Sequence, residues 1–172
     1  MVKSTPEPRF RHERHKSPSP LPQPRDLIIA CPPLRSKVNL SRIVRTASCC
    51  GVRRIITNGS TKIDPTIARD GADQVEIESR RSIVPVLKKL KENGFQIVGL
   101  EQTTNSKNLH HFQFARKTVL VVGHERHGLT DDVLGVLDHA VEIPVYGLPF
   151  SYNVATATSM ALYEYCRQFP GG

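Results

Sequence analysis

The stretch TVLVVGHERHGL, residues 118–129, joins a short apolar run to a loop that is bracketed by two glycines. The run TVLVV is rich in β-branched residues and carries no charge, which favours a buried strand. Gly123 and Gly128 permit a tight turn and a close approach of the backbone to a ligand, and a helix is expected to begin near Thr130. Strand, loop and helix in this order are typical of an α/β protein.

Similar apolar runs recur along the chain and alternate with helical patterns. The other runs are LIIAC (27–31), RRII (53–56), QVEI (74–77), FQIVGL (95–100) and VEIPV (141–145). Helical patterns lie at 39–51, 82–94, 130–139 and 153–169, and Pro85 is expected in the first turn of a helix that starts near Arg81. The alternation predicts an α/β fold with a mostly parallel sheet and helices on both faces. Ligand sites in such folds lie beyond the carboxyl ends of the strands.

The first 25 residues differ in composition from the rest of the chain. They contain six of the thirteen prolines and six Lys/Arg residues against two acids, with few apolar side chains. Such a segment cannot offset its ordering entropy, so residues 1–25 are expected to form a disordered, basic, Pro-rich arm that lacks the apolar core of a signal peptide. Residues 26–172 have the length of one ordinary domain.

The net charge and the cysteines indicate which partners and which compartment to expect. The net charge of +8 points to a polyanion such as nucleic acid, and a solvated surface that merely happens to be basic is the alternative. No apolar run approaches membrane-spanning length, so no membrane partner is expected. The four cysteines show no metal-type spacing, which favours a reduced, cytoplasmic protein.

The loop GHERHGL (123–129) admits three interpretations. His124 and His127 are three residues apart rather than four and have no third ligand in view, so no metal site is expected. A phosphate-binding loop fits the glycines, but there is neither a Walker lysine nor dinucleotide-type spacing, and on the glycines alone a plain tight turn explains them better. Glu125 follows the strand directly and can accept hydrogen bonds from backbone N–H groups, or simply brace the loop.

The segment NLSRIVRTASCCG (39–51) predicts an amphipathic helix whose apolar stripe faces the sheet. Asn39 precedes the first apolar residue and is predicted as the N-cap. Arg45 falls about 140° from Leu40, off the stripe and near Arg42 on the outer side. A cap followed by a solvated basic face explains these residues as well as a functional site does.

The segment IPVYGLPFSYNVATATSMALYEY (143–165) combines the end of a strand, a bend and a helix of small residues. A strand is expected to end at Pro144, and Ser151 and Asn153 are expected to begin the helix. Met160 and Tyr163 fall away from the apolar stripe that faces the domain. A helix that is apolar on more than one side is buried both by its own domain and by a partner subunit.

Taken together, NLSRIVRTA (39–47), GHERHGL and IPVYGLPFSYNVATA (143–157) resemble the three motifs of the SpoU-type (SPOUT superfamily, TrmH-like) RNA 2′-O-ribose methyltransferases. The resemblance covers about residues 26–168, and LEQTTNS (100–106) also resembles a loop of small members. It implies a C-terminal deep trefoil knot, S-adenosylmethionine as cofactor and an obligate homodimer. The chain departs from the motifs at Ser41, where glycine is common, and at Val145 and Tyr152, where methionine and leucine are common.

The same resemblance implies which residues carry the reaction. By motif position the catalytic candidates are Asn39, Arg45, Glu125, Ser151 and Asn153. The candidates for cofactor binding are Leu100, Gly123, Ile143, Ser151 and Tyr152.

These residues suggest a division of roles. We interpret Arg45, which the resemblance places against the partner chain's cofactor loops, as a grip on a phosphate rather than a base, because a guanidinium keeps its proton. Ser151 and Asn153 would orient the hydroxyl or bind cofactor. The expected substrate is tRNA or rRNA; a non-catalytic RNA-binding dimer and a base methyltransferase are the alternatives.

Overall fold

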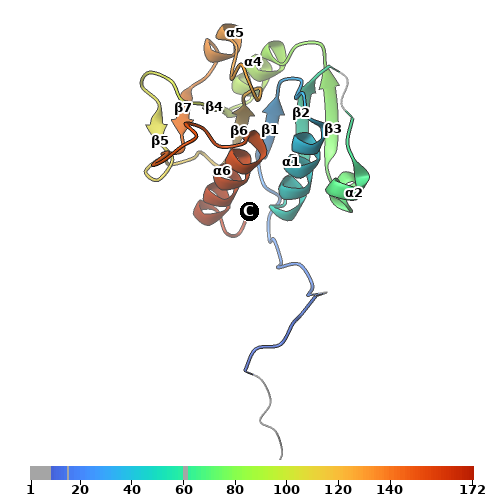
Figure 1. Ribbon diagram of the computed structural model, residues 1–172. Helices are drawn as coiled ribbons and strands as arrows, with labels where there is room; N and C mark the ends of the chain where they lie inside the picture. Colours follow the sequence, from blue (N-terminus) through green and yellow to red (C-terminus); the bar gives the residue numbers. More distant parts are fainter. Residues whose placement is uncertain (1–8, 15, 60–61) are drawn as a thin grey trace, which may run out of the picture.

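The computed structural model describes residues 9–14, 16–59 and 62–172, and its centre is one parallel sheet (Figure 1). Each pair of neighbouring strands is parallel, in the order β3-β2-β1-β6-β4-β7-β5. The strands are β1 (Leu27–Cys31), β2 (Arg54–Asn58), β3 (Glu76–Arg80), β4 (Gln96–Leu100), β5 (Lys107–Asn108), β6 (Thr118–Val122) and β7 (His139–Glu142).

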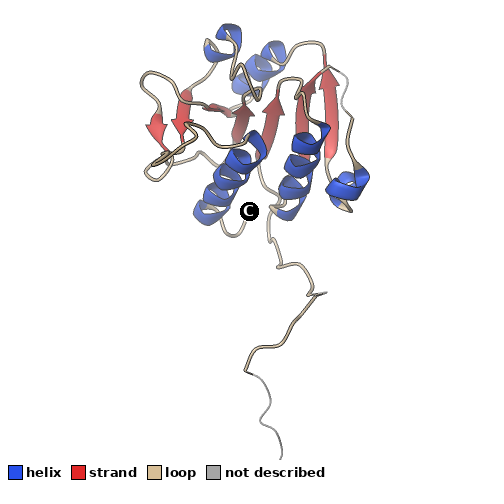
Figure 2. Cartoon of the chain, viewed as in Figure 1, coloured by secondary structure: helices blue, strands red, loops and turns tan. Residues whose placement is uncertain are grey.

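Helices cover both faces of the sheet (Figure 2). They are α1 (Lys37–Cys49), α2 (Pro65–Ala68), α3 (Gly71–Gln74), α4 (Val84–Glu92), α5 (Asp131–Leu134) and α6 (Val154–Gln168). On β1, Ile29 packs in the cluster of α1 and α6, whereas its neighbour Ile28 packs in the cluster of α4 and α5. Alternate strand residues therefore feed two cores, and each fully buried Ile or Leu contributes about 1.5–3 kcal/mol. This confirms the predicted α/β class.

Most predicted elements agree with the structure in kind and differ at their ends. The exception is the helix predicted at 130–139, which is only the four-residue α5, and His139 begins β7. All six predicted strands are present, and Pro85 lies in the first turn of α4 as predicted, although that helix begins at Val84 rather than near Arg81. The strand predicted to end at Pro144 ends at Glu142 instead. The two-residue strand β5 was not predicted, because so short a segment has no periodicity.

The last residue of the predicted arm, Arg25, already contacts the domain, which was predicted to begin at residue 26. Residues 1–8 and 15 of the predicted arm lie outside the described residues, and disorder of the arm stays a prediction. The Arg25 guanidinium donates hydrogen bonds to the carbonyl oxygens of Cys50 (2.6 Å) and Phe169 (2.5 Å), beyond the C-termini of α1 and α6. A cation is favoured at this end of a helix dipole. The deep trefoil knot likewise stays a prediction.

Candidate active site

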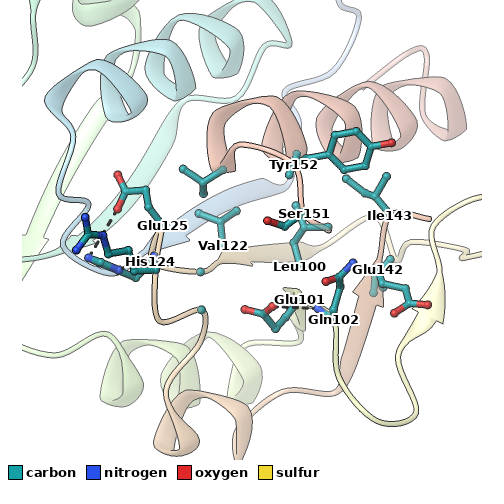
Figure 3. Close-up of a pocket in the computed structure, with 16 residues that line it drawn as sticks. Leu100, Glu101, Gln102, Val122, His124, Glu125, Glu142, Ile143, Ser151 and Tyr152 are labelled. Atoms are coloured by element: carbon teal, nitrogen blue, oxygen red, sulfur yellow. Dashed lines mark hydrogen bonds and ion pairs between the residues drawn. The ribbon is translucent and has the colours of Figure 1, made fainter. Parts of the chain in front are cut away.

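A cavity of about 240 Å³ opens at the carboxyl ends of β4, β6 and β7 (Figure 3). Its walls come from segments that are distant in sequence and that follow three strands or precede α6. In Figure 3, Glu125 and His124 lie on one side and Ile143 and Tyr152 on the other. The lining includes six residues named from the sequence: Leu100, Gly123, Glu125, Ile143, Ser151 and Tyr152.

The loop 123–129 forms a closed turn against this cavity. His124 N donates to Gly128 O and Gly128 N donates to His124 O, both at 3.0 Å. The rings of His124 and His127 stack with their centroids 4.9 Å apart. Within residues 9–14, 16–59 and 62–172, no group of three or more His, Cys, Asp or Glu residues could hold a metal ion. Residues of the loop line the cavity, so a ligand there can contact the backbone of the loop.

Glu101, which sequence reasoning did not single out, holds the turn from the β4 side. Its carboxylate accepts a hydrogen bond from Leu129 N (3.0 Å) and another from Gln102 N (3.0 Å). Gly128 has φ +63°, and a Cβ at that position would collide with Glu101 Oε2. The close approach therefore favours glycine, because a Cβ would push the Glu101 carboxylate away from Leu129 N. A carboxylate directly after a strand was the signal that could have identified Glu101.

Gly128→Ala is expected to lower the free energy of unfolding by at least about 2 kcal/mol, from left-handed strain plus the collision. Gly94→Ala is the matched control, because Gly94 has φ +84° but nothing lies within 4 Å of its added Cβ. It is expected to cost about 1 kcal/mol. Urea denaturation compares the two variants, and equal costs would contradict the crowding by Glu101.

Glu125 joins the loop to the start of α1. Its Oε2 accepts from Arg35 N (3.0 Å), and its Oε1 accepts from Ser36 N and from Asn39 Nδ2 (both 3.1 Å). Asn39 Oδ1 in turn accepts from Asn153 Nδ2 (3.2 Å). Hydrogen bonds thus link all three motif segments through Glu125, Asn39 and Asn153.

Burial of the Glu125 carboxyl opposes its ionisation. The hydrogen bonds from Asn39 and from the backbone of Arg35 and Ser36 outweigh burial and lower the pKa of Glu125 below its ordinary value. The Glu125 side chain is only 16% exposed, and its carboxylate lies at the N-terminus of α1, where the helix dipole favours a negative charge. Glu125 accepts hydrogen bonds from backbone N–H groups and in this way also braces the loop, so the geometry fits both interpretations of this residue.

The prediction that Asn39 is the N-cap of α1 is wrong. Ser36 caps the helix, with its Oγ accepting from Asn39 N (3.4 Å), and the helix begins at Lys37. Asn39 lies in the first turn, 7% exposed, with its amide turned toward Glu125. The partner that draws it there is 86 residues away in sequence, beyond the reach of a local pattern. The prediction for Asn153 is confirmed, because it caps α6 through Ala155 N (3.0 Å).

Arg45 does not line the cavity. Its exposed side chain borders a second hollow between α1, α2 and α6, together with Arg42, Arg69 and Ser159. This confirms that Arg45 and Arg42 lie on the outer side of α1. The structure of one chain therefore gathers the cofactor candidates and the Glu125 network in one place, and holds Arg45 in another.

Two of the departures from the motifs have a visible consequence. Ser41 Oγ donates to Lys37 O (2.6 Å) and accepts from Asp64 N (2.8 Å), which ties α1 to the segment before α2. Tyr152 lines the cavity, and its hydroxyl donates to Pro144 O (3.3 Å). Further lining residues that were not predicted are Gln102, Arg126 and Glu142.

The fold and the place of the cavity define an α/β protein with a candidate ligand site at the carboxyl edge of a parallel sheet. Residues 26–163 match the sequence model of the SpoU rRNA Methylase family, and the chain belongs to that family. It is 34% identical over 148 residues to a tRNA (guanosine(18)-2′-O)-methyltransferase of Aquifex aeolicus, covering 84% of this chain and 70% of that protein. A protein with the same description from Escherichia coli K12 is 30% identical, and the match covers 83% of this chain and 64% of that protein.

Solved structures agree with this assignment. The crystal structure of the A. aeolicus TrmH/SpoU tRNA modifying enzyme superposes with a TM-score of 0.81 at 33% identity, over 87% of this chain and 78% of that one. An AdoMet-bound rRNA methyltransferase from Sinorhizobium meliloti has a TM-score of 0.69 at 25% identity, over 88% of this chain and 61% of that one. In the described part of the chain, no helix is long and apolar enough to cross a membrane.

Proposed function

We propose that this protein transfers a methyl group from S-adenosylmethionine to a ribose 2′-hydroxyl of tRNA or rRNA. The observation that carries the proposal is the convergence of the three motif segments. Glu125 and Asn153, which are 86 and 114 residues from Asn39, both hydrogen-bond to it beside the cavity. Family membership and the tRNA and rRNA methyltransferases among the relatives support the same reaction.

The residues around the cavity fit S-adenosylmethionine. Gly123 lines the cavity, and a Cβ there would lie 3.0 Å from the backbone of Gly128, so glycine at this position lets the two ends of the loop approach each other. Leu100 and Ile143 supply an apolar wall, and backbone N–H and C=O groups of the strand ends are the polar groups that suit an adenine edge. The bound cofactor supplies a methyl group on a positively charged sulfur.

The chain's own residues would orient the hydroxyl and stabilise the charge that develops on its oxygen. Ser151 lines the cavity, where its hydroxyl can bind a ribose hydroxyl. Asn153, two residues later at the N-cap of α6, would orient this segment through its hydrogen bond to Asn39. A guanidinium keeps its proton, so Arg45 would bind a neighbouring phosphate with its planar fork and stabilise negative charge. Holding the reactants in line can contribute about 7–11 kcal/mol to the barrier reduction.

A second copy of the chain would complete this site. Arg45 lies outside the cavity of its own chain, so it can serve the reaction only if a partner brings it to a cavity. Large apolar side chains are exposed nearby on α6, where Met160 is 36% and Tyr163 72% exposed. The exposed side chains of Tyr146, Leu148 and Phe150 in the preceding loop also support a homodimer.

Tyr163→Arg is expected to weaken the dimer at least about tenfold, because a charge would replace apolar contact in the interface. Sedimentation velocity over a range of protein concentrations measures the change. Phe10→Arg is the control, because Phe10 is also an exposed aromatic (84%) but belongs to the arm. A dimer of wild-type strength in Tyr163→Arg would exclude this face of α6 from the interface.

The direct test is incubation of the purified protein with labelled S-adenosylmethionine and either total tRNA or total rRNA. Nucleoside mass spectrometry of each RNA pool should reveal a 2′-O-methylated nucleoside that is absent with Arg45→Ala. A methylated base instead would overturn the ribose assignment. Absence of cofactor binding and of transfer would overturn the enzymatic proposal and favour an RNA-binding dimer.

We also propose the cytoplasm as the compartment of this protein. The four cysteines, Cys31, Cys49, Cys50 and Cys166, are all free, as expected in a reducing environment. Only Cys49 among them is exposed.

A further inference from the structure

A third hollow, of about 460 Å³, lies at the carboxyl ends of β1 and β2, beside the start of α1. We call it the Thr57 hollow. Apolar residues line part of it, and three exposed cations, Arg35, Lys37 and Lys62, line the rest. None of the cations was assigned a role in the cavity described above.

Thr57 is the unexplained residue of this hollow. It is 1% exposed, and its Oγ1 is a buried side-chain oxygen without a hydrogen-bond partner in the part of the chain that the structure describes. Ile55, two residues earlier on β2, packs in the α1 core, so Thr57 points to the same face of the sheet. A buried hydroxyl without a partner is costly and calls for an explanation. Its place in the lining supplies one, because a ligand in the hollow can accept a hydrogen bond from the Thr57 hydroxyl.

The charges around the hollow favour an anion. The N-terminus of α1, which begins at Lys37, is already occupied by the Glu125 carboxylate, so the positive charge of the hollow comes from the three cations. Among the described residues, the carboxylate that forms an ion pair with these cations is Asp64, which lies 3.5 Å from Lys37 Nζ. Ser41 Oγ accepts from Asp64 N (2.8 Å), which fastens the segment carrying Lys62 against α1. The walls of the hollow are thus held in place without a ligand.

The hollow also adjoins the candidate active site. The backbone N–H groups of Arg35 and Ser36 are held by Glu125, whose side chain lines the cavity. Arg35 therefore belongs to both places, with its backbone on the cavity side and its side chain in the Thr57 hollow. Because Arg35 joins the two places, a polyanion that enters the cavity can extend toward the side chain of Arg35.

We propose that the Thr57 hollow binds a backbone phosphate of the RNA substrate, separate from the phosphate assigned to Arg45. The Thr57 hydroxyl donates to a phosphate oxygen, and Arg35, Lys37 and Lys62 neutralise its charge. The inference rests on the proposed function, since it takes RNA as the substrate. Its effect is to fix the register of the RNA over the cavity.

The test measures the affinity of the full chain for total tRNA across a salt series, without turnover. Thr57→Val keeps the shape of the side chain and removes the donor, and Lys62→Ala removes a cation. We expect each to weaken binding about three- to tenfold, and Lys62→Ala to reduce the slope of log K against log salt by about 1. Lys88→Ala is the matched control, because Lys88 is an exposed lysine of α4 on the opposite face. It should change binding less than twofold.

Three outcomes separate this inference from the proposed function. Weaker tRNA binding in both variants, with S-adenosylmethionine binding unchanged, supports the hollow even if no methyl transfer is found. If the wild type transfers methyl groups and both variants bind tRNA as tightly as the wild type, the inference about the Thr57 hollow is overturned. The proposed function then stays intact. In a further arm, inorganic phosphate is added alone: thermal stabilisation that Thr57→Val abolishes, with tRNA binding unaffected, identifies a free phosphate ligand and overturns the RNA assignment.

Discussion

Arg45→Ala is expected to reduce the single-turnover rate of methyl transfer about 10²–10³-fold, the loss typical of removing one group that stabilises developing negative charge. Binding of S-adenosylmethionine should stay within about twofold of wild type, because Arg45 does not line the cavity. The measurement is single-turnover transfer at saturating RNA and cofactor, with equilibrium cofactor binding beside it. Loss of both quantities would mean that Arg45 acts on the structure of the cavity.

Two variants separate the planar fork of Arg45 from its charge. Arg45→Lys keeps the charge but cannot bind a phosphate bidentately, so it should recover less than about a tenth of the rate. Arg42→Ala removes a second cation from the same hollow, one turn earlier on α1, and should leave most of the rate. Near-wild-type activity of Arg45→Lys across pH would contradict the bidentate grip.

Glu125→Gln is expected to lower the free energy of unfolding by about 2 kcal/mol, because two backbone N–H groups and the Asn39 amide lose a charged acceptor. For a domain of this size the midpoint of thermal unfolding should fall by about 4–8 °C. Calorimetry at pH 7 measures the shift. Glu92→Gln, on the exposed face of α4, is the control and should change the midpoint by about 1 °C or less.

The effect of Glu125 should depend on pH in a definite direction. The pKa of its carboxyl is lowered in the folded protein from an ordinary value of about 4.5. A lowered pKa stabilises the fold at pH values above the unfolded pKa, and this stabilisation is lost as the pH falls through the folded value. Wild type and Glu125→Gln should therefore differ fully at pH 7 and progressively less below about 4.5. A constant difference down to acid pH would show that shape, and not charge, is responsible.

The hydrogen bonds of Glu125 also connect the loop 123–129 to two helices. The loop that lines the cavity is joined through Glu125 to the first turn of α1, and through Asn39 to the cap of α6. Displacement of one segment therefore strains the other two. This coupling is the route by which we propose that Asn39, which does not line the cavity, acts on the reaction.

The sequence by itself determined the α/β class, the strands and the edge of the sheet at which the site lies. The runs around Ile29 and Leu120 are buried on both faces, so β-branched, uncharged composition identifies them without knowledge of their neighbours. The motif segments then follow strand ends, where sites in such folds lie. The family resemblance supplied the roles that we propose for Arg45 and Ser151, which periodicity cannot reveal.

Only the tertiary structure decided which side chains contact one another at the carboxyl edge of the sheet. Glu125 reaches the start of α1 because β6 lies beside β1 in the sheet, and strand order is not written in any local pattern. For the same reason Asn39 serves Glu125 rather than capping its helix, and Thr57 is left without a partner beside three cations. Propensity and periodicity act over a few residues, whereas the contacts of Asn39 with Glu125 and Asn153 join residues 86 and 114 apart, and packing of the whole sheet selects them.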